Sequence, residues 1–323
     1  MLPVSHKITI GTATYTSDGK TGLLDLLMKA ALAVPVNTCR LVLGSPEALK
    51  IALDDSVSIE LGYGKDLTVI FTGTVSSVEW SIDKVSIQAA SSFRTLAAVR
   101  FNLLYERSNA GDIVKDVLGR LKLPVGKVES GIQFPSYALG DHQTAYTHLQ
   151  TLAQQCGCDF YGDIKDKAVF AKYKPAATHE FKYGSNILAF DLDEQTASVT
   201  GVEVYGESPA SGSQGAEATS WLTKKEVKGT AGTTSGAIAR IFDPTVRTKN
   251  AAASIAEASL KSYHQKRRGF MKVLGTPNVK LTDAVKVSQM PVAQHNGTFK
   301  VTGIGHTVNV RKGFVTVINW EET

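Results

Sequence analysis

Cysteine is scarce in this sequence of 323 residues, which contains three. So few cysteines, in an odd number, exclude the disulfide framework that stabilises small secreted domains. The longest apolar stretch, MKAALAVPV, includes Lys29 and Pro35 and is too short to cross a bilayer. The N-terminus has no basic start followed by an apolar core, so no signal peptide is expected. We therefore expect a protein that stays in the cytoplasm without inserting into a membrane.

Motifs that mark catalytic chemistry are also missing. The stretch SDGKTG resembles the end of a phosphate-binding loop, but Thr14 stands where that loop needs its first glycine. Neither G-x-S-x-G nor H-E-x-x-H occurs. The stretch FDLDEQ places three carboxylates together, as in a paired-carboxylate or divalent-ion site, but the end of a strand explains it equally well. These carboxylates belong to Asp191, Asp193 and Glu194.

Two of the three cysteines, Cys156 and Cys158, form one Cys-Gly-Cys. A zinc site needs four ligands, and this pair supplies at most two. The nearest histidines, His142 and His148, are predicted to lie on the preceding helix, roughly 240° apart around its axis. His306 has no acid or nucleophile near it in the sequence and is predicted to be structural. We predict packing thiols, and no catalytic residue, cofactor-binding residue or metal ligand.

The net charge of +5 is unevenly distributed. Residues 220–272 contain three acids, Glu226, Asp243 and Glu257, against eleven basic residues, which gives a local charge of +8. This charge favours a solvated helix face and loop, and the alternative is a surface that meets an acidic partner or nucleic acid. Aromatic residues do not interleave with it, so single-strand recognition is not supported. The basic residues are Lys224, Lys225, Lys228, Arg240, Arg247, Lys249, Lys261, Lys266, Arg267, Arg268 and Lys272.

Residues 1–100 are predicted to be mostly β. SVSIELGYG alternates apolar and polar residues, and LTVIFTGTV and SSVEWSIDKVSIQAA continue the pattern as a meander. TGLLDLLMKAALA has strong helix propensity, so the state of residues 20–34 stays open.

Residues 101–184 have a different pattern. Apolar residues at helical spacing predict a helix over 108–122, capped by Ser108, and a second over 142–156 that ends at Gly157. CDFY and AVFAKY flank the turn GDIKDK and predict a β-hairpin.

Residues 185–323 return to strands. Residues 207–237 are rich in small polar residues and are predicted to form a mobile loop. A helix follows in NAAASIAEASLKSYHQKRRG, predicted to end with three basic residues before Gly269. The strands AVKVSQM, GTFKVTGIG, HTVNV and GFVTVINW form a second meander, with Asn296 and Gly297 as a tight hairpin turn.

Three stretches resemble the phage tail-hub family, which includes the late control gene D proteins and the first part of VgrG spike proteins. GDHQTAYTHLQTLAQQCGCDFYGDIKDKAVF resembles a helix, Gly, Phe-Tyr and hairpin segment of that family. VNTCRLVLG with DDSVSIELGYGKDLTVIFTGTVSSVEW is similar to its first barrel, and NGTFKVTGIGHTVNVRKGFVTVI to its closing segment. The middle helix, TAYTHLQTLAQQ, lacks the family's usual acid, Phe-Leu and Arg-Leu-Ala.

The resemblance implies an α+β, mainly β fold in which two β-barrel-like units flank an α/β insertion. The implied domains are a first barrel-like domain over 1–100, an α/β middle domain over 101–184, and a second barrel-like domain over 185–323. The implied role is a structural baseplate hub, not an enzyme and without a cofactor, that adapts a six-fold tube to a three-fold spike. It is expected in the virion or a contractile injection particle, assembled in the bacterial cytoplasm.

The implied partners are two further copies in a homotrimer, the tail tube protein, other baseplate components and a tape measure protein. Because the chain stops at Thr323, the spike is expected to be a separate protein. Phage tail, pyocin-like device and injection system stay open. Two alternatives stay beside the hub: a nucleic-acid-binding protein that uses the basic 220–272 segment, and a carbohydrate hydrolase that uses Asp191 and Asp193.

Overall fold

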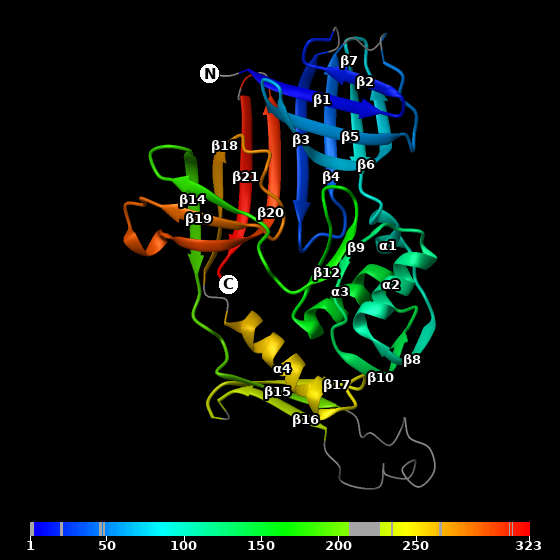
Figure 1. The fold of residues 1–323 in the computed structure, drawn as a ribbon, viewed down its shortest axis with the longest axis vertical. Helices are drawn as coiled ribbons and strands as arrows, with labels where there is room; N and C mark the ends of the chain where they lie inside the picture. Colours follow the sequence, from blue (N-terminus) through cyan, green and yellow to red (C-terminus); the bar gives the residue numbers. More distant parts are fainter. Residues whose placement is uncertain are drawn as a thin grey trace.

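The computed structural model describes residues 3–19, 22–44, 47, 49–206, 227–233, 235–264, 267–309, 311 and 313–323. The molecule is elongated, with the long strands of both barrel-like units in one half and the helices, together with several shorter strands, in the other (Figure 1). Within the described ranges, no helix has the length and apolar character needed to cross a membrane.

Strands from the first part of the chain form one barrel-like unit. Neighbouring strands pair antiparallel in the order β3-β4-β7-β6-β5-β1-β2, so the predicted meander through β5, β6 and β7 is confirmed. LTVIFTGTV and SSVEW belong to one strand, β6, with a register shift between Val75 and Ser77. The strands are β1 Val4–Ile10, β2 Ala13–Thr16, β3 Leu23–Ala31, β4 Thr38–Gly44, β5 Ser56–Tyr63, β6 Asp66–Trp80 and β7 Lys84–Ala90.

The segment whose state the sequence left open is strand β3. Leu26, Met28 and Ala30 alternate into the core, which is the period of a strand. β3 pairs with β4 on one side and with β20 (Gly297–Asn309) on the other. Pairing on both sides satisfies its backbone polar groups, and this tertiary context outweighs the local helix propensity.

Strands from the end of the chain form the second barrel-like unit. Their order is β13-β19-β20-β21-β18-β14, and the short turn 183–186 joins β13 to β14 at the two ends of that order. The α+β, mainly β fold with two barrel-like units is thereby confirmed. The remaining bounds are β13 Thr178–Lys182, β14 Ile187–Glu194, β18 Arg267–Leu274, β19 Ala284–Ser288 and β21 Gly313–Glu321.

Strand β20 joins the two barrel-like units into one 13-stranded sheet. Its first residues pair with β19 and its later residues with β3, on either side of a register shift between Val301 and Gly303. Two predictions were wrong here. GTFKVTGIG and HTVNV form one strand, β20, rather than two. Asn296 and Gly297 do not form a tight hairpin turn, because the connection between β19 and β20 is longer and spans residues 289–296. Asn296 serves that connection by accepting a hydrogen bond from the Met290 N–H.

The middle of the chain forms the predicted helices and hairpin. Helix α2 begins after Asn109, whose side chain accepts from the Asp112 N–H, so the predicted cap at Ser108 was one residue early. Helix α3 ends at Gly157, which has φ 63° as predicted. The elements are α1 Arg94–Ala98, β8 Leu103–Asn109, α2 Ala110–Arg120, β9 Val125–Val128, β10 Gln133–Leu139, α3 Ala145–Cys156, β11 Asp159–Gly162 and β12 Ala168–Ala171.

A further sheet and helix pack against these elements. The strands β15 (Gly201–Gly206), β16 (Lys228–Gly232) and β17 (Ile238–Asp243) form a sheet in the order β16-β15-β17. Much of the predicted mobile loop, 207–226 and residue 234, lies outside the described residues, but 228–232 is strand rather than loop. Helix α4 spans Lys249–Tyr263.

The predicted basic end of this last helix is wrong. Helix α4 ends at Tyr263, and Arg267 and Arg268 begin β18 instead. There Arg268 lies in register with Asp193 of β14 and Glu321 of β21. Pairing with a strand on each side determines the extended backbone conformation here. The sequence showed only basic residues before a glycine, a pattern typical of the end of a helix.

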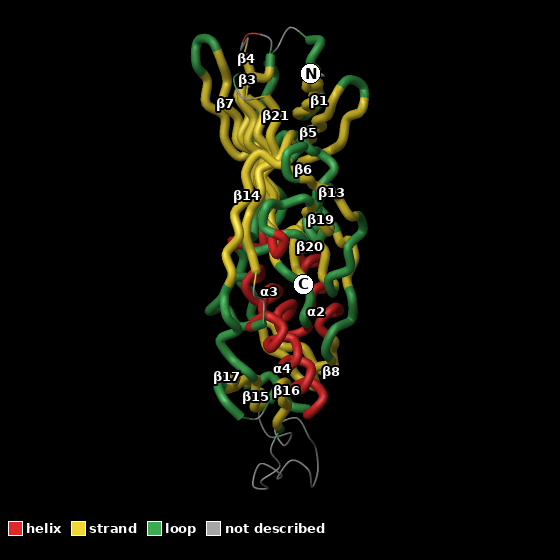
Figure 2. Tube along the Cα trace, turned by 90° about the vertical axis from the view of Figure 1, so that its left-hand side faces the viewer, coloured by secondary structure: helices red, strands yellow, loops and turns green. Residues whose placement is uncertain are grey.

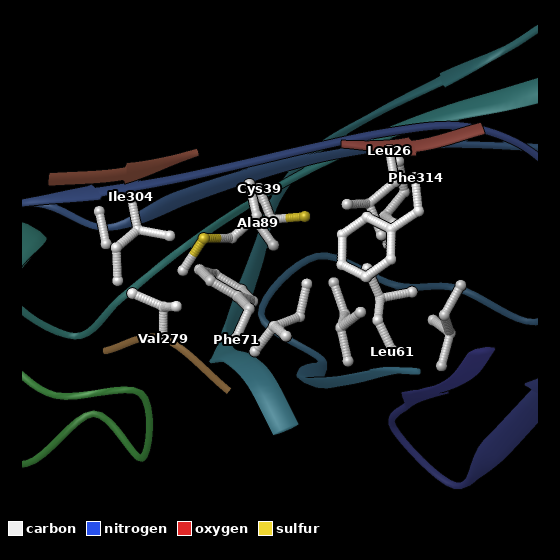
Figure 3. Close-up of a cluster of buried hydrophobic side chains, with 14 of the residues drawn as sticks. Leu26, Cys39, Leu61, Phe71, Ala89, Val279, Ile304 and Phe314 are labelled. Carbon is white, nitrogen blue, oxygen red and sulfur yellow. The ribbon is translucent and has the colours of Figure 1, made fainter. Parts of the chain in front are cut away.

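Two hydrophobic cores divide the molecule, and each gathers distant parts of the chain. The first unites both barrel-like units, and Figure 3 shows Leu26, Cys39 and Phe71 packed with Ile304 and Phe314. The second joins the middle helices to β15 and α4. Figure 2 shows helices α2, α3 and α4 in the half of the molecule that holds the second core. The predicted domain boundaries at residues 100 and 184 stay a prediction, because each core gathers residues from distant parts of the chain and does not follow the order of the sequence.

Candidate functional site

The Cys-Gly-Cys lies beside an open groove of about 840 Å³ between the β9–β10 connection, the end of α3 and the start of α4. Cys156 is buried, and its Sγ accepts a hydrogen bond from the Ile132 N–H at 3.3 Å. Burial raises the pKa of both thiols, that of Cys158 to about 12. Both cysteines are free, and the described residues include no group of three metal-ligating side chains. The arrangement favours packing over thiol chemistry.

The two histidines at the start of helix α3 contact each other. His142 precedes helix α3 instead of lying on it, so the predicted separation around one helix axis is wrong. The rings meet edge to face with centroids 5.6 Å apart, and His148 Nε2 lies 2.8 Å from the Gly140 carbonyl oxygen. That carbonyl fixes the His148 ring in a structural position.

The three acids predicted as an alternative site lie on and at the end of β14. Asp193 pairs with Arg268, with 3.1 Å between its Oδ2 and the arginine Nε, and also accepts a hydrogen bond from Gln195. Asp191 is exposed on the same strand. A paired-carboxylate mechanism needs one carboxyl group with a raised pKa beside a substrate cleft. Asp193 is held by Arg268 on an exposed strand, and this geometry does not favour hydrolysis.

His306 lies within β20 and is 2 % exposed. Its Nδ1 lies 3.0 Å from Thr316 Oγ1 on β21, and its ring meets Phe314 edge-on at 5.7 Å. Burial lowers its pKa to about 4. The histidine therefore packs as a neutral ring where the two barrel-like units share a sheet.

Part of the basic 220–272 segment is paired with acids. Glu203 of β15 receives Lys228 at 2.8 Å and Arg240 at 3.1 Å. Hydrogen bonds from Lys228, Tyr205 and Arg240 lower the pKa of Glu203 to about 2. Lys224, Lys225 and Lys266 lie outside the described residues. Charges held this way are less available to phosphates, so this part of the segment does not favour nucleic-acid binding.

A buried cation joins the two cores. Lys300 of β20 donates to Asp159 at 2.7 Å and to Glu321 at 3.0 Å, and its ammonium lies over the Tyr173 ring. Nearby, the hydroxyls of Tyr161 and Thr282 lie 2.9 Å apart. These contacts between the hairpin of the middle segment and the second barrel-like unit fix the two halves against each other. No local pattern in the sequence indicates this ion network, because Asp159 and Lys300 lie far apart in the chain.

The features suited to assembly are open strand edges. Among the described residues, β14 pairs with β18 alone, which leaves one edge of β14 free. Beside it runs an apolar groove of about 300 Å³, whose lining includes Tyr183, Leu188 and Val292. These three side chains are 42–52 % exposed. An open edge beside exposed apolar residues is typical of a surface that another chain covers.

Comparison with known proteins extends the sequence resemblance. The chain is similar to a tail protein from Neisseria meningitidis MC58, with a TM-score of 0.71, 14% identity, and coverage of 99% of this chain and 97% of that one. It is similar to the 43 kDa tail protein of prophage MuSo2 from Shewanella oneidensis, with a TM-score of 0.72, 13% identity, and coverage of 99% and 98%.

A third similar structure is a component of the E. coli type VI secretion system that itself shows similarity to the T4 bacteriophage tail proteins gp27 and gp5. Its TM-score is 0.61 at 9% identity, over 98% of this chain and 77% of that one. At these identities the likeness shows that this chain shares its fold with those tail and secretion-system proteins. The narrower assignment to the hub stays a proposal.

No curated protein matches the sequence. A family model described as the Alg8 N-terminal domain matches residues 54–310, which is more than half of the 323 residues. The chain therefore belongs to the Alg8 N-terminal domain family.

Proposed function

We propose that this protein is a structural baseplate hub of a contractile phage tail or related injection particle. The observation that carries the proposal is the repetition within one chain of two barrel-like units that share a sheet. Three copies of such a chain present six similar units around a true three-fold axis. That arrangement meets both a six-fold tube and a three-fold spike, which is the role that the sequence resemblance implies.

The hub is a homotrimer, and the free edge of β14 with its apolar groove is the surface that best suits a copy-to-copy contact. Pairing or covering an open edge removes its unpaired backbone groups from water. Cyclic closure then limits assembly to a discrete ring instead of a fibre. The tail tube protein, a separate spike protein, other baseplate components and a tape measure protein are the proposed partners, and no enzymatic step or cofactor is assigned.

The test is the mass of the purified protein by mass photometry, alone and with tube and spike proteins. We expect a species of about three times 34.6 kDa. Leu188→Glu and Val292→Glu, which place charge beside the β14 edge, are expected to shift the distribution to single chains. Leu53→Glu, at a side chain that is 64 % exposed in the β4–β5 connection, is the matched control. A protein that stays monomeric or dimeric even with its partners contradicts the hub role.

A further inference from the structure

The tip of the β6–β7 hairpin carries apolar side chains that the described residues leave exposed. Ile82, in the turn, is fully exposed, and Trp80, the last residue of β6, is 52 % exposed. Figure 2 shows β7 at the end of the molecule farthest from the helices. Leaving an indole and an isoleucine together in water is unfavourable, so this tip is a candidate contact surface.

The backbone of β6 is also open beside this tip. Strand β5 pairs with β6 only as far as Thr74, and Val75 bonds to the backbone of Asp54 and Asp55. Ser76 is the extra residue at the register shift, and from Ser77 to Trp80 β6 pairs with β7 on one side, while no described strand pairs with its other side. Outward N–H and C=O groups in a row are best satisfied by another extended strand.

The side chains along this edge specify what the added strand presents. Val78 and Trp80 lie in register with Ile87 and Val85, which are fully buried, so their side points toward the first core. Val78 packs against that core, whereas Trp80 lies at its margin. A neighbouring strand with apolar residues on this side extends the core over Trp80 and removes apolar surface from water.

The opposite side of the same edge carries charge. Glu79 lies in register with Ser86, is exposed, and forms no ion pair with any described residue. Cross-strand neighbours of opposite charge are favourable, so a basic residue suits the position beside Glu79. The pattern that fits the edge is a basic residue between two apolar ones.

We propose that the β6 edge from Ser76 to Trp80, with Ile82 at its tip, binds an extended segment of another protein by strand addition. The segment alternates apolar and basic residues, with the apolar ones over Val78 and Trp80 and a basic one beside Glu79. The inference concerns a surface distinct from the β14 edge and does not depend on the proposed hub role.

The test uses two fluorescein-labelled synthetic peptides of about eight residues, one alternating valine with lysine and one alternating valine with glutamate. Anisotropy titrations with the full chain are expected to show binding of the lysine peptide at least about tenfold tighter than that of the glutamate peptide. Hydrogen exchange is expected to show the amides of 76–80 protected by the bound peptide.

Variants separate this site from non-specific attraction. Trp80→Ser and Ile82→Ser are expected to weaken the lysine peptide about tenfold or more, and Glu79→Lys to reverse the preference between the peptides. Val34→Ser is the matched control, because Val34 is 52 % exposed like Trp80 and lies in the β3–β4 turn, at the end of the strands opposite the β6–β7 tip, and it is expected to change nothing. Because Ile82 is fully exposed, its replacement leaves folding intact.

Three outcomes overturn the proposal. The first is no binding of either peptide up to about 1 mM chain, a range that includes weak strand addition. The second is binding without protection of 76–80, or binding that Val34→Ser weakens as much as Trp80→Ser does. The third is that Trp80→Ser lowers the oligomeric state in analytical ultracentrifugation while peptide binding is unchanged, which makes the edge a contact between copies of this chain.

Discussion

Lowering the pH should weaken the sheet that joins the two barrel-like units, because His306 is buried there as a neutral ring. Its pKa is about 4 in the folded chain, against an ordinary value of 6.5 in the unfolded chain. Below pH 6.5 the unfolded chain therefore binds a proton that the folded chain does not. The stability that His306 contributes is full above pH 6.5 and is lost progressively as the pH falls toward 4.

The magnitude follows from the difference between the two pKa values. Two and a half pKa units, at about 1.4 kcal/mol each, give a full effect of about 3 kcal/mol. Most of it, about 2–3 kcal/mol, is lost between pH 7 and pH 4.5. Such a loss is a large fraction of the stability of an ordinary domain.

Urea unfolding at pH 7 and at pH 4.5, followed by tryptophan fluorescence, measures this loss. His306→Gln is the matched variant, since it keeps a polar group near Thr316 and does not titrate. The variant is expected to be less stable at pH 7 but to lose about 2–3 kcal/mol less on acidification than the wild type. Carboxylates and other histidines titrate in both proteins and cancel in the comparison. Equal losses in the two proteins would refute the reasoning.

Three other predictions follow from particular contacts. With a pKa of about 12, Cys158 has about one ten-thousandth of its thiol ionised at pH 8, so it should react with a disulfide reagent far more slowly than the urea-unfolded chain. Lys300→Met leaves two partly buried carboxylates unpaired and should lower stability by about 3 kcal/mol in urea unfolding, and no loss would show that the ion network is unimportant. Gly157→Ala should lower the free energy of unfolding by about 1 kcal/mol because φ of Gly157 is 63°. Gly119→Ala should raise it by about 0.5–1 kcal/mol, because Gly119 lies inside a helix with open space around it. A lower melting temperature for Gly119→Ala than for Gly157→Ala would contradict this.

The sequence by itself determined the elements whose signals are local. The apolar stripe of 110–120, the stripe of 145–156 with Gly157 behind it, and the hairpin around GDIKDK each lie within one short window. Their periodicity and their capping residues act over a few residues, so one sequence suffices to read them. The mainly β composition of both ends of the chain was predicted for the same reason.

Tertiary structure decided the elements that depend on distant partners. Residues 23–31 have helix propensity, yet they form a strand because β4 and β20 pair with both of its edges. Arg267 and Arg268 were predicted to end a helix, yet they belong to strand β18, which pairs with β14 on one side and with β21 on the other.

The candidate surfaces divide in the same way. The sequence placed Cys156 on the apolar stripe of a helix, which indicates a packing role for its thiol. The sequence did not show that Lys300 forms an ion pair with Asp159 between the two cores. From the sequence, Trp80 and Ile82 were predicted as ordinary residues of the β meander. Only the order of strands in the sheet shows that they lie at an open edge. Helix periods and caps are properties of neighbours in the chain, whereas a free edge or a buried ion pair exists only once strands far apart in sequence have met.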